Sequence, residues 1–141
     1  MRSNLKLLGL TAAGWLLAAP LASAEMVQFK AALNGAAEVP ANDSAGSGTA
    51  EVSLDTDAKK VTWKVTQQGL SGEPTAAHFH GPAAAGENAG PALDISGTLA
   101  EGTSDLTDAQ ITDLQAGKWY VNVHTEKFPD GEIRGQVEKG M

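Results

Sequence analysis

Short runs in which every second residue is apolar recur along this chain, and clusters of Gly, Pro, Asn, Asp or Ser separate them. Successive side chains of a β-strand point to opposite faces, so this alternation is typical of strands with one buried side. The runs cover residues 27–33, 50–54, 61–65, 75–80, 119–125 and 133–137. They predict an all-β fold, an antiparallel β-sandwich or barrel, and they leave the order of the strands open.

The connections between these runs differ in length. Residues 55–60 are polar and few enough to form a hairpin turn between two neighbouring runs. Residues 34–48 and 81–91 are rich in Gly and Ala and contain Pro, so they are expected to be loops. A loop as long as 81–91 is either mobile or functional. One more short strand is expected within residues 93–99.

One short helix is predicted among the strands. Thr107 and Gln110 have the spacing of a capping box, in which the two side chains bond each other's backbone amides. Gly117 is a residue type that commonly ends a helix. The helix is therefore expected over residues 108–115.

The N-terminus has the three parts of a secretory signal peptide. Arg2 and Lys6 accompany an apolar stretch, which leads to a small-x-small cleavage site at residues 22–24. We expect residues 1–24 to be removed, leaving residues 25–141 as one secreted or periplasmic β domain. An uncleaved anchor is the alternative, although the apolar stretch is shorter and more interrupted than the ~20 residues of a membrane span. No later segment of the sequence could cross a bilayer.

Composition limits the chemistry of this domain. The chain has no cysteine, so any metal ligand must be a nitrogen or oxygen atom. Its formal charge of −7 becomes −9 once Arg2 and Lys6 leave with the signal peptide, which disfavours nucleic acid and anionic lipid as partners. The sequence contains no Gly-x-Ser-x-Gly elbow, no phosphate-binding Gly-Lys-Ser/Thr loop and no calcium-loop spacing.

All three histidines of the chain lie in two of the predicted strands. His78 and His80 flank Phe79, and His124 follows Val123. If Phe79 and Val123 face the core, alternation puts all three imidazoles on the outer, solvent-accessible face of the sheet. They can meet only if the two strands are neighbours or if a loop brings them together.

A His-x-His pair on a strand suits metal chemistry. Its two side chains leave the same face ~6.5–7 Å apart, and imidazoles can lean inward to one ion at ~2.0–2.1 Å from each nitrogen. His124 from a second strand would complete a three-histidine set, for which copper or zinc is the favoured ion. The alternative is that the rings simply bond carbonyls or carboxylates at the sheet rim. Glu87, Glu126 and Asp130 are either additional ligands or, as we favour, solvated surface.

Glu38 and Arg134 are candidates for an ion pair across the domain. Glu38 precedes Val39-Pro40, and Arg134 lies in the last predicted strand. An ion pair between them would tie a loop to a strand, because Arg–carboxylate pairs often have that structural role.

Several of these segments together resemble one known family. Leu33-Asn34-Gly35-Ala36-Ala37-Glu38-Val39-Pro40, Ala76-Ala77-His78-Phe79-His80-Gly81-Pro82-Ala83, Tyr120-Val121-Asn122-Val123-His124-Thr125 and Pro129-Asp130-Gly131-Glu132-Ile133-Arg134-Gly135-Gln136 follow one another as in the CHRD domain. This is the module found in chordin and in many bacterial exported proteins. The resemblance implies a β-rich extracytoplasmic domain and no settled activity. The histidine arrangement is also similar, locally only, to the copper ligands of copper/zinc superoxide dismutase.

Two functions follow as expectations. In the first, His78, His80 and His124 hold a copper or zinc ion, for metal handling or for redox chemistry at an exposed ion. In the second, the domain is a non-enzymatic interaction module of the cell envelope or extracellular matrix that binds protein or glycan. There the histidines would be structural and would orient the loop at residues 81–91.

Overall fold

The computed structural model describes residues 9, 11–17 and 25–140. Most of the predicted signal peptide, including its cleavage site, lies outside these residues. Within the described part of the chain, no helix is both long and apolar enough to span a membrane.

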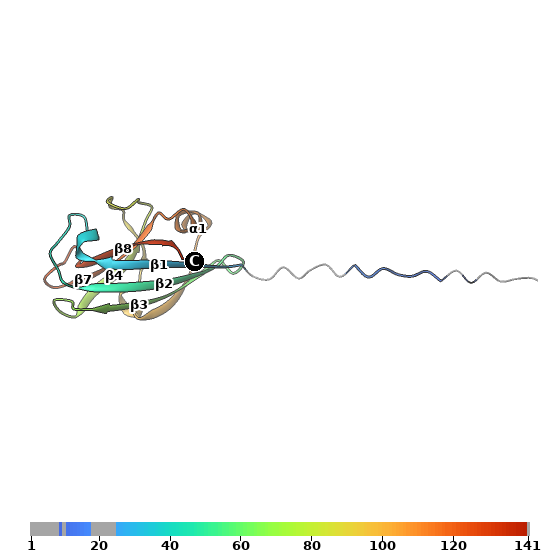
Figure 1. Ribbon diagram of the computed structural model, residues 1–141, viewed down its shortest axis with the longest axis horizontal. Coiled ribbons are helices and arrows are strands. Elements are labelled where there is room, and N and C mark those ends of the chain that lie inside the picture. The colour runs from blue at the N-terminus through green and yellow to red at the C-terminus, as the bar shows by residue number, and fades with distance from the viewer. Residues whose placement is uncertain (1–8, 10, 18–24, 141) are drawn as a thin grey trace, which may run out of the picture.

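The domain contains eight strands, one α-helix and two short 3-10 helices within residues 25–140 (Figure 1). In chain order they are β1 (Met26–Asn34), η1 (Gly35–Ala37), β2 (Ser47–Asp55), β3 (Lys60–Gln68), β4 (Pro74–His80), β5 (Pro91–Asp94), η2 (Ser96–Thr98), β6 (Glu101–Asp105), α1 (Asp108–Gln115), β7 (Trp119–Thr125) and β8 (Ile133–Lys139). The prediction of an all-β fold with one short helix is therefore confirmed.

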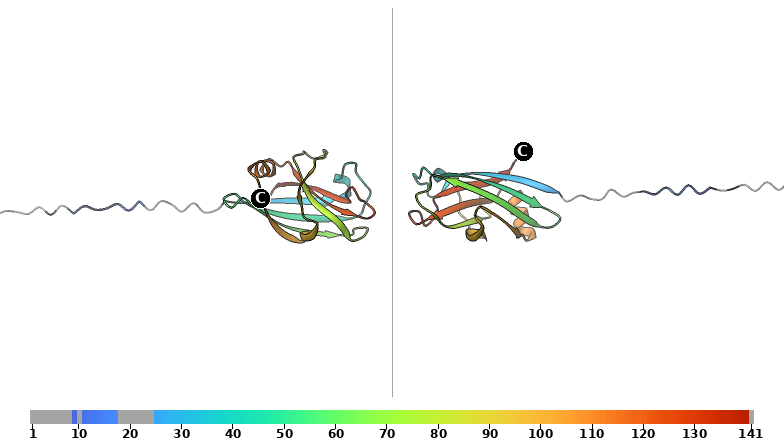
Figure 2. Two further views of the ribbon diagram at one scale, coloured as in Figure 1. Left: turned by 180° about the vertical axis from the view of Figure 1, so that it is seen from behind. Right: turned by 90° about the horizontal axis from the view of Figure 1, so that it is seen from below.

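The strands form a single antiparallel sheet in the order β5-β4-β7-β8-β1-β2-β3-β6. Its two edge strands, β5 and β6, are consecutive in the chain, so the segment that contains η2 must join the two ends of the sheet. That segment bonds both ends: Ile95 N donates to Ala77 O of β4 at 2.9 Å, and Trp63 Nε1 of β3 donates to Thr98 O at 2.8 Å. The sheet is consequently curled into a partial barrel, whose strands twist around a shared interior in Figures 1 and 2.

The core occupies the inside of this curl. The alternating apolar residues predicted for the strands are buried there. Three of them, Trp63, Phe79 and Trp119, have rings in contact. Phe79 packs edge-on to Trp63 at 5.8 Å between ring centroids and lies 5.6 Å from Trp119. These contacts join β3, β4 and β7 across the interior. Each buried aromatic side chain contributes roughly 1.5–3 kcal/mol through loss of contact with water.

The helix agrees with the sequence-based prediction in both extent and mechanism. α1 spans Asp108–Gln115, and both bonds of the capping box are present. Gln110 N donates to Thr107 Oγ1 at 3.2 Å, and Thr107 N donates to Gln110 Oε1 at 2.9 Å. Gly117 follows the helix with a φ of 73°, the left-handed conformation that favours glycine.

Two segments differ from expectation. The strand expected within residues 93–99 is confined to β5 and ends at Asp94, after which the chain turns into η2. β6 was not predicted, because its sequence Glu-Gly-Thr-Ser-Asp has no apolar residue to reveal an alternation. It is an edge strand that packs Gly102 against the Trp63 indole, where a Cβ would collide with the ring.

Candidate metal site

The three histidines lie together on the outer face of the sheet. β4, which carries His78 and His80, pairs directly with β7, which carries His124. Phe79 and Val123 are fully buried in the core, so the predicted facing of the strands is confirmed. One ring nitrogen from each histidine lies within 4.8 Å of one from each of the others, and all three residues are half-buried.

Backbone carbonyls fix the tautomer of two of the rings. His80 Nδ1 lies 2.9 Å from Ala89 O, and His124 Nδ1 lies 2.8 Å from Pro129 O. A carbonyl oxygen only accepts, so each Nδ1 must carry the hydrogen. In the neutral ring, Nε2 of His80 and of His124 then keeps its lone pair.

His78 is oriented from the opposite end of its ring. Its Nε2 lies 3.8 Å from the carboxylate oxygen Oδ1 of Asp94, while its Nδ1 lies 3.2 Å from His124 Nε2. With its hydrogen on Nε2, on the side of the Asp94 carboxylate, His78 would present the lone pair of Nδ1 to an ion. Metal-binding histidines usually direct their second ring nitrogen to a carboxylate or carbonyl in this way. His80 and His124 have such a partner at hydrogen-bond distance, whereas the carboxylate beside His78 lies farther away, at 3.8 Å.

The geometry is close to that of a small tetrahedral ion. Bonds of ~2.0–2.1 Å set two nitrogen ligands ~3.3–3.4 Å apart, and the 3.2 Å between His78 Nδ1 and His124 Nε2 is near this value. The ring centroids of His78 and His80 are 5.4 Å apart, and those of His78 and His124 are 5.1 Å apart. The ligand nitrogens of all three histidines lie within 4.8 Å of one another.

The surroundings favour the uncharged rings. Burial, the largest effect, lowers the pKa of both His78 and His80 below the ordinary 6.5. The nearby His124 lowers both pKa values further, because a second positive charge so close is unfavourable. A neutral imidazole is the form that binds a metal ion.

The outer face around the histidines is less open than expected from the sequence. Tyr120 and Asn122 share this face of β7 with His124, yet they are only 3% and 4% exposed. Residues 81–90 cover Tyr120, whose hydroxyl donates to Ala89 O and accepts from Ala89 N, both at 3.1 Å, while Asn122 lies against His80 and Gly131. Tyr120 also stacks flat on the His80 ring, with centroids 4.7 Å apart. The predicted loop therefore forms one wall of the site.

Arg134 holds this loop from β8. Its guanidinium lies 3.5 Å above the Tyr120 ring, on a side chain that is 2% exposed. Its nitrogens donate to Asn88 Oδ1 at 2.9 Å and to Glu87 O. Arg134, Tyr120 and His80 thus form one stacked series from β8 to the histidine cluster.

The ion pair expected between Glu38 and Arg134 is not formed. The two side chains are buried, but their charged atoms make no contact within 4.0 Å, because Arg134 is directed to the 81–90 loop instead. Oε1 of Glu38 has no hydrogen-bond partner within residues 25–140. Burial raises the pKa of Glu38 to about 7, while Arg134 and hydrogen bonding by Asn122 oppose the rise.

A second buried carboxylate, Glu132, shows the contrast. Its oxygens accept from Ser71 N at 3.1 and 3.0 Å, from the Ser71 hydroxyl, and from Thr125 Oγ1 at 3.0 Å. Burial alone would raise its pKa, but these bonds lower it overall. Glu132 is a satisfied structural anion, whereas Glu38 is left partly unsatisfied beside the site.

The carboxylates near the histidines in sequence are not those near them in space. Glu87, Glu126 and Asp130 are exposed, and none joins the three histidines in a group that could share an ion. The carboxylate beside the cluster is Asp94, which pairs opposite His78 in the register of β5 and β4. No signal in the sequence could reveal Asp94, because its position depends on strand order.

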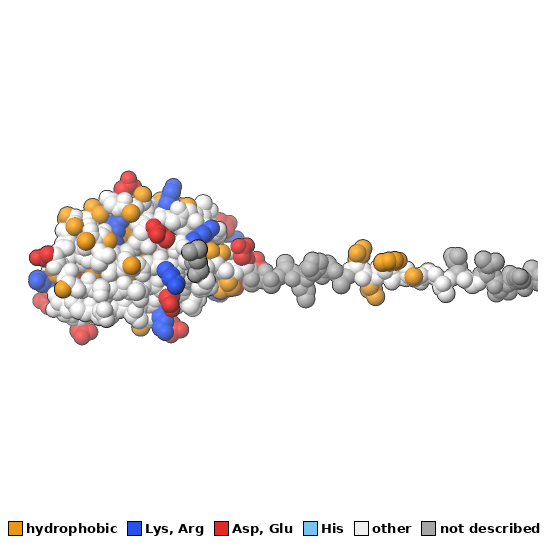
Figure 3. All heavy atoms as spheres, in the orientation of Figure 1, with side chains coloured by type: hydrophobic (Ala, Val, Ile, Leu, Met, Phe, Trp, Pro, Cys, Tyr) orange, Lys and Arg blue, Asp and Glu red, His pale blue; other side chains and the backbone are white. Residues whose placement is uncertain are grey.

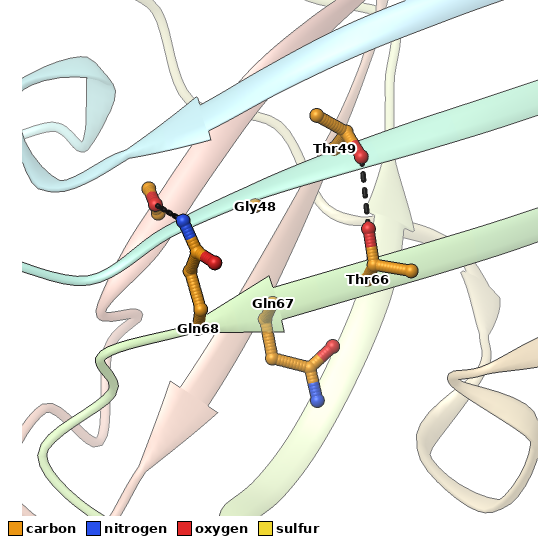
Figure 4. Close-up of a pocket in the computed structure, with 6 residues that line it drawn as sticks. Gly48, Thr49, Thr66, Gln67 and Gln68 are labelled. Atoms are coloured by element: carbon orange, nitrogen blue, oxygen red, sulfur yellow. Dashed lines mark hydrogen bonds between the residues drawn. The ribbon is translucent and has the colours of Figure 1, made fainter.

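The remaining surface offers less chemistry. On the face seen in Figure 3, acidic and basic side chains are interspersed. A hollow of about 250 Å³ lies over β2 and β3, lined by Ser47, Gly48, Thr49, Thr66, Gln67 and Gln68 (Figure 4). Its hydroxyls and amides bond one another, as Thr49 Oγ1 and Thr66 Oγ1 do at 2.9 Å, and no titratable group lines it.

A curled antiparallel sheet with three convergent histidines defines a small all-β domain with a candidate metal site. The model of the CHRD domain family matches residues 29–137. The chain therefore belongs to the CHRD domain family, as its motifs indicated. No curated protein and no solved structure matches the chain closely enough to add to this.

Proposed function

We propose that this protein is an exported metal-binding protein that holds a copper or zinc ion through His78, His80 and His124. The observation that carries the proposal is the convergence of three ring nitrogens within 4.8 Å. The outward nitrogens of His80 and His124 are already bonded to Ala89 O and Pro129 O, and the outward nitrogen of His78 lies 3.8 Å from the Asp94 carboxylate.

The donor set favours these ions over others. Imidazole nitrogen suits copper and zinc, whereas calcium and magnesium select oxygen ligands. Three protein ligands leave a coordination position for water or another group, as in catalytic zinc sites. Because the histidines are half-buried rather than enclosed, an ion can enter from solvent without unfolding the sheet.

Export rests on the sequence before Glu25 and on membership in the CHRD family, whose domains are typically extracellular. Its test is the N-terminus of protein isolated from cells that express the full chain. Cleavage before Glu25 and recovery outside the cytoplasm are expected. An intact N-terminus on cytoplasmic protein would contradict export without affecting the metal site.

Metal analysis tests the site itself. After loading with zinc or copper and desalting, about one ion per chain is expected to remain. His80→Ala and His124→Ala should lose it, while Thr66→Ala, a matched change on the outer face of β3, should retain it. Equal trace binding in all four proteins would overturn the proposal.

A second candidate is an interaction module with structural histidines, and the bond from His80 to Ala89 favours it because it anchors the 81–90 loop. In that case His80→Ala lowers the melting temperature equally with and without metal, and adding metal does not raise the melting temperature of the wild-type protein. Recovery of the same protein or glycan from envelope extract by wild type, and its loss with His80→Ala, would support this role.

A further inference from the structure

Asn122 lies beside the three histidines and contacts one of them, His80. Its backbone pairs opposite His78 in β4 and opposite Arg134 in β8, and its side chain is 4% exposed. The amide oxygen Oδ1 lies 3.0 Å from His80 Nε2. Alternation alone gives Asn122 the same face as His124, two residues along β7.

The contact between Asn122 and His80 lacks a hydrogen. The single hydrogen of neutral His80 is on Nδ1, where Ala89 O accepts it. Nε2 then presents a lone pair to Asn122 Oδ1, which is also an acceptor. Two acceptors 3.0 Å apart repel one another unless something positive lies beside both of them. Ring nitrogens of His78 and His124 converge on the same place, each within 4.8 Å of the ligand nitrogen of His80, so a cation shared by the three rings would lie beside both atoms.

The Glu38 carboxylate lies on the side of the Asn122 amide nitrogen, away from His80. Asn122 Nδ2 and Glu38 Oε1 pack against the same side of Gly131, where an added Cβ would lie 2.7 Å from Nδ2 and would collide with Oε1. The amide nitrogen therefore faces the carboxylate, which otherwise has no partner for Oε1 among residues 25–140. Turning the amide over would put its oxygen beside the carboxylate and remove this attraction.

We propose that Asn122 Oδ1 is the fourth donor to the ion, so that the site is a three-nitrogen, one-oxygen set with Glu38 as the positioning residue. A cation bound to His80 Nε2 and Asn122 Oδ1 satisfies both lone pairs at once. This inference rests on the proposed function and makes it more specific. A carbonyl oxygen is a hard donor, so it favours Zn²⁺ and Cu²⁺ over Cu⁺, which prefers soft ligands.

The test compares metal affinities of wild type, Asn122→Ala and Asn122→Asp by competition titration with Zn²⁺, Cu²⁺ and Cu⁺. Asn122→Ala is expected to weaken Zn²⁺ and Cu²⁺ binding about 10- to 100-fold and Cu⁺ binding much less. Asn122→Asp keeps an oxygen donor and should restore divalent binding. Asn42→Ala is the matched control, because Asn42 donates to Gly131 O and Glu132 O without bonding a histidine.

A spectrum separates ligation from mere support of the fold. With Co²⁺ as the probe, the visible bands of Asn122→Ala should differ from those of wild type, and Glu38→Gln should shift them partway. Melting curves without metal identify any variant that fails to fold. If Asn122→Ala is unfolded, the comparison of wild type with Asn122→Asp replaces it. Unchanged bands and divalent affinities within about threefold of wild type in folded Asn122→Ala would overturn this inference alone. Absence of binding by wild type would overturn the proposed function with it.

Discussion

Asp94 Oδ1 lies 3.8 Å from His78 Nε2, while His78 Nδ1, the other ring nitrogen, lies 3.2 Å from His124 Nε2. The imidazole is thus placed between an anion and the point where the three rings converge. The number of residues between His78 and Asp94 in the sequence does not determine this contact. It follows from the pairing of β5 with β4, which puts the two residues opposite one another.

Asp94→Asn should weaken metal binding about tenfold, because the loss of the negative charge makes His78 a poorer donor and leaves its ring less well oriented. The measurement is the same competition titration with Zn²⁺. Asp94 also accepts bonds from Ser96 N and Ser96 Oγ, at 2.9 and 2.6 Å, so the substitution disturbs the start of η2. Ser96→Ala controls for this disturbance, since it leaves the carboxylate in place. Equal weakening by both variants would show that Asp94 acts only through η2.

The facing of the three histidines could be predicted from individual residues, whereas the pairing of β4 with β7 that brings them together could not. Alternation around Phe79 and Val123 fixed the facing of His78, His80 and His124, because one buried residue determines the direction of its neighbours. The helix was predictable for a similar reason, since both partners of its capping box lie within one turn of chain. These are local relationships, and a sequence records them directly.

Relationships between distant segments were not predictable. The bonds that direct Arg134 to the 81–90 loop, and not to Glu38, depend on where that loop lies over the sheet. The burial of Tyr120 depends on the same loop, and that of Asn122 depends on its contacts with His80 and Gly131. Both residues have the polar character of a solvent-facing position, so the pattern indicates an open surface where the fold provides a covered one.

Glu38→Gln should change the pH dependence of stability. The pKa of Glu38 is raised from 4.5 to about 7 in the folded protein, so folding favours its protonated form. This contribution is fully present below pH 4.5 and is lost as the pH rises through 7, at a cost of about 3 kcal/mol at most. Denaturant unfolding in the presence of a chelator should show Glu38→Gln gaining stability relative to wild type over this interval.

Glu132→Gln is the comparison for that experiment and has the opposite sign. The pKa of Glu132 is lowered, so its ionised form stabilises the fold above pH 4.5 and this stabilisation is lost as the pH falls through the lowered value. The substitution should therefore cost most at neutral pH. A parallel response of the two variants to pH would contradict the different environments of the two carboxylates.

Arg134→Met should loosen the 81–90 loop. It removes the bonds to Glu87 O and Asn88 Oδ1 and the cation above the Tyr120 ring, a combined loss of roughly 2–3 kcal/mol. Hydrogen exchange should accelerate more at residues 84–90 than in β1 and β2. The side-chain bonds lost in the variant join Arg134 to the loop and not to those two strands. Because Arg134 lowers the pKa of Glu38, that pKa should rise further in the variant. Uniform acceleration across the sheet would indicate general destabilisation instead.

Gly131→Ala tests the turn that supports Glu38 and Asn122. Gly131 has a φ of 125°, and an added Cβ would strike both side chains. The backbone strain and the steric collisions add together, so the free energy of unfolding should fall by more than about 2 kcal/mol. Metal binding should also weaken, because Asn122 is displaced.

Gly117→Ala separates the effect of backbone strain from that of steric collision. Gly117 has a φ of 73°, but no atom lies within 4 Å of the added Cβ, so the free energy of unfolding should fall by only about 1 kcal/mol. Gly72→Ala has neither constraint and should be neutral to within about 0.5 kcal/mol. Melting curves and zinc titrations of the three variants give the ranking, and a Gly131→Ala protein as stable as Gly72→Ala would show that Glu38 and Asn122 do not need this glycine.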